Sequence, residues 1–415
     1  MRSPAVLVAA LALAATPAAA LDVDRSAAVL DEAKQLCGEG KALWGVDMCG
    51  PMLLVDPATR EVVANRPGPG LEARGEVFVG RFPADRPVAN TSVEWNGVRW
   101  TMVLAEVPAE REDRAALLMH EAWHRVQADL GFPANSPSLE HLAELEGRVL
   151  MRLEFRALAA ALQASGEAQA AAIGDALAFR ARRHALAPGA GELERQLEMS
   201  EGLAEYTGRR LSRSPDLNAR VVRLIGEIEA LSSYARSAAY ATGPAMGLLL
   251  DQRAPGWRKG LDAEADLAVL LRATLPGADA APQAGGDRYG EAGVRAEETA
   301  ALEARKAAAR DYTARLVEGP VLRLPFQQMQ FSFNPSQVFP LPPHGTVYPT
   351  MRVSDAWGVL EVSGGGLIDP NFSGATVPAP DAGALSGEGW TLKLNDGWRL
   401  APGARSGDLT VEKAP

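Results

Sequence analysis

Five consecutive residues, His120-Glu121-Ala122-Trp123-His124, have the types and spacing of half a zinc site. On an α-helix, positions i and i+4 lie on one face with β-carbons about 5–6 Å apart, so both imidazoles can bind one ion from the same side. Glu121 projects beside them and can act as general base on a water molecule that the metal activates. The alternative interpretation is a pair of ordinary helical histidines without a metal. We expect zinc ligands at His120 and His124, with Glu121 as the catalytic base.

A helix has to present these side chains. Apolar residues precede the motif from Ala115, and Gly131 and Pro133 supply a stop beyond it. From 109 to about 261 the pattern is helical, and Gly, Pro and Ser separate the segments. We predict helices at 109–130, 139–164, 167–186, 190–212, 215–232 and 236–252.

A catalytic zinc site takes three protein ligands, and two glutamates could supply the third. Glu144 lies closer to His124 in sequence, whereas Glu201 lies in Ser200-Glu201-Gly202-Leu203-Ala204-Glu205-Tyr206. Glu201 and Glu205 share one helical face, so Glu201 can bind the metal while Glu205 accepts a hydrogen bond from a ligand histidine. Small residues beside Glu201 allow two helices to approach closely. We favour Glu201, and an ordinary charged stripe is the alternative.

The two motifs together resemble the gluzincin class of zinc metallopeptidases. The resemblance covers about 100–250 and implies zinc ligands His120, His124 and Glu201, with Glu121 as general base. The chain departs from the class in two extra helices, 139–164 and 167–186, between the motifs. Strand 98–107 resembles the edge strand that aligns extended peptide substrates in this class.

Stabilising an oxyanion needs a hydrogen-bond donor near the metal. Tyr240 is our first candidate, followed by Tyr234 and Arg236. A buried tyrosine that only packs in the core is the alternative for each phenol.

The start of the chain predicts export. Residues 1–20 read as a signal peptide: Arg2, an apolar core, and Ala18-Ala19-Ala20 before a mature start at Leu21. The only two cysteines, Cys37 and Cys49, are expected to form a short-loop disulfide in an oxidising compartment. The alanine- and arginine-rich composition suggests a bacterial protein, periplasmic or extracellular.

Charge argues against nucleic acid as a partner. The formal net charge is −10, and no basic block is long enough to follow a phosphate backbone. We interpret the cluster Arg180, Arg182, Arg183 and His184 as the solvated face of a helix end. No segment after the signal peptide has the length and apolarity of a membrane span.

The predicted fold class is α+β. We expect an N-terminal helix and small, mostly antiparallel sheet over 21–108, and a helical, zincin-like catalytic part over 109–275. A mobile loop and long helix follow over 276–318, and an all-β sandwich or barrel occupies 319–415.

The leading functional hypothesis is an exported zinc metallopeptidase acting on a peptide or protein substrate. One alternative is a non-catalytic scaffold or binding protein that acts through its β-module. Another is a zinc amidase acting on cell-wall material.

Overall fold

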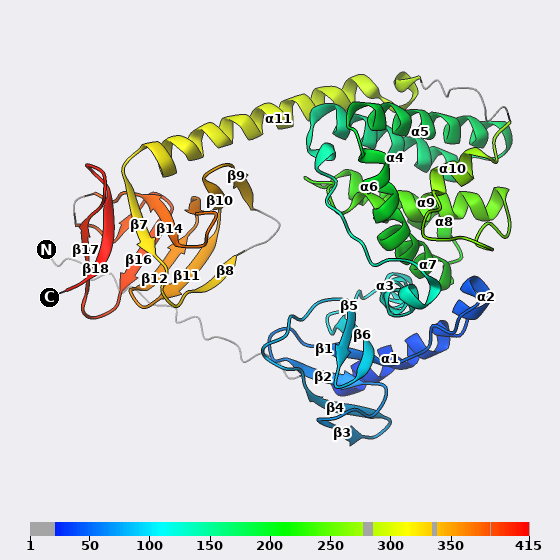
Figure 1. The fold of residues 1–415 in the computed structure, drawn as a ribbon, viewed down its shortest axis with the longest axis horizontal. Coiled ribbons are helices and arrows are strands. Elements are labelled where there is room, and N and C mark those ends of the chain that lie inside the picture. Colours follow the sequence, from blue (N-terminus) through cyan, green and yellow to red (C-terminus); the bar gives the residue numbers. More distant parts are fainter. Residues whose placement is uncertain (1–20, 277–284, 334–337, 382, 415) are drawn as a thin grey trace, which may run out of the picture. The chain divides into compact units, whose positions relative to one another are not determined.

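The computed structural model describes residues 21–276, 285–333, 338–381 and 383–414. Its contacts divide the chain into two compact units, Met1–Ala296 and Glu297–Pro415, which we describe separately (Figure 1). The predicted signal peptide lies outside the described residues.

The first unit begins with a six-stranded sheet in the order β3-β4-β2-β1-β6-β5. Neighbouring strands are antiparallel except β1 and β6, which run parallel with Leu54 opposite Val103. The parallel pair arises because β5 and β6 form a separate hairpin that joins the sheet beside β1. The strands are β1 (Met52–Val55), β2 (Glu61–Ala64), β3 (Leu71–Arg74), β4 (Val77–Arg81), β5 (Thr91–Trp95) and β6 (Val98–Leu104).

The expectation that strand 98–107 forms an edge is wrong. β6 lies between β1 and β5, and β5 is the outer strand on that side. The reason is local, because Asn96 and Gly97 both adopt positive φ and fold β5 back onto β6 as a hairpin. Any backbone pairing of a peptide at this side of the sheet would therefore involve β5.

Two helices cover one face of this sheet, α1 (Val23–Cys37) and α3 (Arg111–Val126). On this face, the side chains of Leu54 in β1, Val63 in β2 and Val103 in β6 pack with the two helices in the main hydrophobic core. The other face has a smaller core of its own, which includes Trp95 and Trp100. This alternation is the period-two pattern of strands, and it fixes α3 against the sheet.

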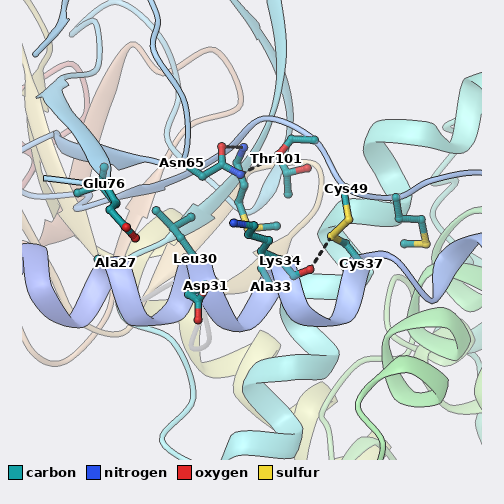
Figure 2. A pocket seen from close by; sticks show the side chains of 14 residues that line it. Ala27, Leu30, Asp31, Ala33, Lys34, Cys37, Cys49, Asn65, Glu76 and Thr101 are labelled. Carbon is teal, nitrogen blue, oxygen red and sulfur yellow. Dashed lines mark hydrogen bonds between the residues drawn. A yellow bond between two sulfur atoms is a disulfide. The ribbon is translucent and has the colours of Figure 1, made fainter. Parts of the chain in front are cut away.

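Cys37 ends α1 and forms a disulfide with Cys49, after the short helix α2 (Gly40–Trp44). Figure 2 shows the disulfide in the wall of a cavity of about 310 Å³ between α1 and the sheet. Lys34 of α1 points into this cavity. The cavity lining does not include the motif histidines.

The rest of the first unit is helical, close to the predicted ranges. Predicted helix 190–212 is interrupted by a π-helical turn, η3 (Glu198–Gly202), and predicted helix 236–252 continues through Pro244. The elements are η1 (Gln127–Leu130), η2 (Glu140–Ala143), α4 (Leu145–Gln163), α5 (Gly166–Leu186), α6 (Ala190–Leu197), α7 (Leu203–Leu211), α8 (Leu217–Glu229), α9 (Ala238–Arg253), α10 (Leu267–Arg272) and η4 (Gly286–Tyr289).

Helix α11 (Glu291–Thr313) contains the division between the units and is followed by η5 (Ala314–Glu318). The second unit then has two sheets, ordered β17-β18-β7-β14-β13-β10-β9 and β15-β16-β12-β11-β8. One core contains side chains of both, such as Leu322 and Val377 from the first and Val353 and Leu392 from the second. Two sheets that share a core form a sandwich. Its strands are β7 (Val321–Pro325), β8 (Gln330–Phe333), β9 (Phe339–Leu341), β10 (Gly345–Tyr348), β11 (Met351–Asp355), β12 (Gly358–Val362), β13 (Gly366–Ile368), β14 (Gly374–Pro378), β15 (Ser386–Gly387), β16 (Trp390–Leu394), β17 (Trp398–Pro402) and β18 (Leu409–Lys413).

The fold is α+β, with an N-terminal sheet, a helical middle and a C-terminal β region, as the sequence predicts. Within the described residues, no helix combines the length and apolarity needed to cross a membrane.

Candidate metal centre

Helix α3 places both motif histidines on one face. Ala115, Leu118 and Trp123 bury the helix in the core, so the positions of the two imidazoles are fixed by packing. The rings of His120 and His124 lie 4.9 Å apart between centroids. Their Nε2 atoms approach to 3.1 Å.

The other nitrogen of each imidazole is held by an acceptor. His120 Nδ1 donates to Glu205 Oε2 at 2.9 Å, and His124 Nδ1 donates to Gln127 Oε1 at 2.8 Å. Gln127 Nε2 donates to the carbonyl of Pro133, which orients its amide oxygen toward the ring. A neutral imidazole that donates through Nδ1 presents a lone pair on Nε2. Both histidines therefore present Nε2, the atom that faces the other ring.

Glu201 completes a triangle with these nitrogens. Its Oε2 lies 3.5 Å from His120 Nε2 and 3.4 Å from His124 Nε2. Among the described residues, His120, His124 and Glu201 are the group of three whose donor atoms all lie close enough to hold one metal ion. Glu144 is not in this group and occupies the N-cap position of α4, where its side chain makes no capping hydrogen bond. The structure thus brings Glu201, rather than the glutamate nearer in sequence, to the histidines.

The triangle fits a zinc ion. Zinc–nitrogen bonds of 2.0–2.1 Å at tetrahedral angles separate two ligand atoms by roughly 3.3 Å, and the three sides measure 3.1, 3.4 and 3.5 Å. Two imidazoles and one carboxylate are also a donor set that catalytic zinc uses. The fit therefore holds in both distance and chemistry.

The charge of the cluster favours a cation. Burial lowers the pKa of His120, but hydrogen bonds with Glu201 and Glu205 outweigh burial and raise it to about 10. The same two carboxylates have lowered pKa values, because their hydrogen bonds with histidine outweigh burial. The cluster thus stabilises positive charge, which a proton or a metal ion can supply.

Glu121 is buried, and one of its carboxylate oxygens lacks a hydrogen-bond partner. The residue is 5% exposed, and its Oε2 atom has no hydrogen bond to any described residue. Burial raises the pKa of Glu121, which disfavours the charged form. A buried carboxylate oxygen without a partner, next to the group of His120, His124 and Glu201, is free to act on a ligand held there.

Tyr240, near the start of α9, reaches the cluster from another side. Its hydroxyl donates to Glu201 Oε2 at 2.7 Å, and its ring stacks on His120 with centroids 5.5 Å apart. Burial, together with the Glu201 carboxylate, raises the pKa of Tyr240 and keeps the phenol protonated. Tyr234 instead donates to the backbone carbonyl of Glu229, and Arg236 lies in the turn before α9.

A chain of charged groups continues behind His120. Glu205, on α7, accepts hydrogen bonds from His120 and from Arg209 Nε at 2.7 Å, and Arg209 also donates to Asp113 on α3. Close contact between α3 and α7 makes this possible, because a β-carbon at Gly208 would lie 2.3 Å from the carbonyl oxygen of Ala116. Glycine at 208 allows α3, which carries the two histidines, to meet α7, which carries Glu205.

Sequence reasoning missed two partners of the cluster and misjudged another group. Gln127 follows the motif by one helical turn, a spacing that could have indicated its contact with His124. Ser136 donates to Glu201 Oε1 at 2.7 Å, and no sequence pattern indicated it. The interpretation of Arg180 and Arg183 as solvated is wrong, because both are buried in ion pairs with glutamates.

Comparison of the chain with protein-family models, with curated proteins and with solved structures gives no match.

Proposed function

We propose that this protein is an exported zinc-dependent metallopeptidase. One observation carries the proposal: the Nε2 atoms of His120 and His124 and Oε2 of Glu201 form a triangle with sides of 3.1–3.5 Å. The unpartnered carboxylate of Glu121 beside this triangle favours a hydrolase over a structural zinc site, since a structural site needs no base.

Each residue of the cluster has a role in such a reaction. A bound zinc ion would supply Lewis-acid activation of the substrate carbonyl and of water. Glu121 accepts the proton of the attacking water and later delivers it to the leaving amine. Glu205 and Gln127 hold the two imidazoles in the tautomer that binds metal. Tyr240 supplies a protonated hydroxyl next to Glu201 that can stabilise negative charge on the carbonyl oxygen.

Export rests on separate observations. The N-terminal sequence has the three parts of a signal peptide, and Cys37 and Cys49 form a disulfide, which persists in oxidising compartments. Fractionation of a bacterial host that expresses the full chain, with N-terminal sequencing of the exported product, tests this. A product that begins at Leu21 supports export, and an uncleaved chain retained in the cytoplasm contradicts it.

The test of the proposed activity combines metal analysis with turnover. Purified protein should contain about one zinc per chain and cleave members of a peptide library, and a chelator should stop cleavage. Glu201→Ala should lose the zinc, whereas Glu144→Ala should keep both zinc and activity. Zinc without cleavage of any peptide would contradict the peptidase proposal, and cleavage of cell-wall fragments alone would make the protein an amidase. Loss of zinc in Glu144→Ala but not in Glu201→Ala would show that Glu144, and not Glu201, is the third ligand.

A further inference from the structure

The helix that carries Glu201 is irregular at that residue. Between α6 and α7, the five residues Glu198–Gly202 form a π-helical turn, a rare geometry that is frequent at functional sites. The turn packs directly on α9, because a β-carbon at Gly243 would lie 2.3 Å from the Cα of Gly202. Pro244 follows in α9, where its missing N–H leaves the carbonyl of Tyr240 without its usual helical donor. Two irregular backbones thus meet beside the metal cluster.

A buried side chain at the start of the turn is held from both sides. Glu198 is 3% exposed. Arg180, on α5, binds both of its carboxylate oxygens, and Thr242, on α9, donates its hydroxyl to Oε1 at 2.6 Å. These contacts fix the first residue of the π turn to two other helices.

Arg180 belongs to a larger buried network. Its Nε donates to Glu154 on α4 at 2.9 Å, and Arg183 joins Glu154 to Glu194 on α6. Each charged group in this network makes at least one ion pair, which is the condition under which buried ions are tolerated. α4 and α5 are the two helices between the sequence motifs that set this chain apart from the gluzincin pattern. They therefore supply the groups that hold the turn.

We propose that Arg180, Glu198 and Thr242 are positioning residues that hold the π turn, and with it Glu201, in the register that binds the metal. Each residue of an α-helix turns by about 100°. Return of the five-residue turn to regular α geometry would therefore rotate Glu201 relative to one of its flanking helices and remove its carboxylate from the two Nε2 atoms. This inference rests on the proposed metal site, and it gives α4 and α5 a role in metal binding.

The test compares two substitutions that each remove one buried hydroxyl donating to a carboxylate. Thr242→Val removes the bond to Glu198, and Tyr289→Phe removes the bond of 2.8 Å to Asp175, which also lies on α5 but outside the network. Zinc affinity is measured by competition with a chromophoric chelator, and the thermal midpoint of the zinc-free proteins is measured alongside. We expect Thr242→Val to weaken zinc binding about 10-fold, Thr242→Ser to restore it, and Tyr289→Phe to bind zinc like the wild type.

The outcomes separate this inference from the proposed function. Wild-type protein that binds no zinc would overturn both. Zinc affinity of Thr242→Val equal to wild type would overturn the positioning role alone, and so would an equal loss of affinity in Tyr289→Phe. A double substitution, Arg180→Met with Glu198→Met, removes both charges of this ion pair together, and Glu154, the other partner of Arg180, keeps its ion pair with Arg183. It should keep a cooperative thermal transition while its zinc affinity falls by at least about 10-fold.

Discussion

Replacing Glu121 by glutamine tests the central chemical assignment. Oε2 of the side chain has no hydrogen bond to any described residue, and glutamine has nearly the same shape, so the substitution breaks no hydrogen bond of that atom. It removes the group that accepts a proton. General base catalysis contributes about 10²- to 10⁴-fold, which corresponds to about 2.7–5.5 kcal/mol of transition-state stabilisation. We expect kcat/KM to fall by that factor while zinc content stays near one per chain.

Stability provides a second readout of the same variant. Because burial raises the pKa of Glu121, this carboxyl lowers the stability of the fold at pH values where it is ionised in the unfolded chain, and that cost is absent below the pKa of the unfolded chain. Glutamine removes this cost, so zinc-free Glu121→Gln should unfold at the same temperature as zinc-free wild type or at a higher one.

The assay is hydrolysis of a fluorogenic peptide from the library, with metal analysis of each preparation. Glu106→Gln is a matched control, because Glu106 is exposed and precedes α3, and it should behave like wild type. More than a tenth of the wild-type kcat/KM in Glu121→Gln would refute the assigned role, as would loss of zinc.

Three further predictions concern other parts of the first unit. Tyr240→Phe should keep zinc but lower kcat by about 10²-fold, the effect of removing one oxyanion donor; an unchanged kcat in steady-state assays would assign the phenol to packing. Replacing Cys37 and Cys49 by alanine should cost about 3 kcal/mol, because the disulfide closes a short loop in the unfolded chain; urea unfolding measures this, and no difference would contradict the loop argument. Burial raises the pKa of Glu194, but the charge of Arg183 outweighs burial and lowers this pKa well below its usual 4.5. The stability that Glu194 contributes is therefore complete above pH 4.5 and is lost as the pH falls below 4.5 toward the lowered pKa. Urea unfolding from pH 7 to 3 should therefore show a smaller decline for Glu194→Gln than for wild type, and parallel curves would contradict this.

Local sequence patterns determined much of the fold. Period-two and helical patterns, with Gly and Pro as stops, placed most helices of 109–261 within a few residues, because these signals act over one or two turns. The i, i+4 spacing of His120 and His124 is a pattern of the same short range, and it predicted that both side chains lie on one helical face. The small residues around Glu201 indicated a close helix contact, but Gly202 meets Gly243 of α9, and the close approach to the histidine helix α3 is made at Gly208.

Only the tertiary structure decided which distant groups meet. Periodicity does not encode the order of strands, so the place of β6 inside the sheet depended on how the hairpin joined β1. Arg180 resembles any charged helix residue in sequence, and it is buried because Glu154 and Glu198 neutralise it from two other helices. Likewise, Glu201 rather than Glu144 lies with the two histidines because of contacts between residues far apart in the chain, and such contacts leave no local pattern to read.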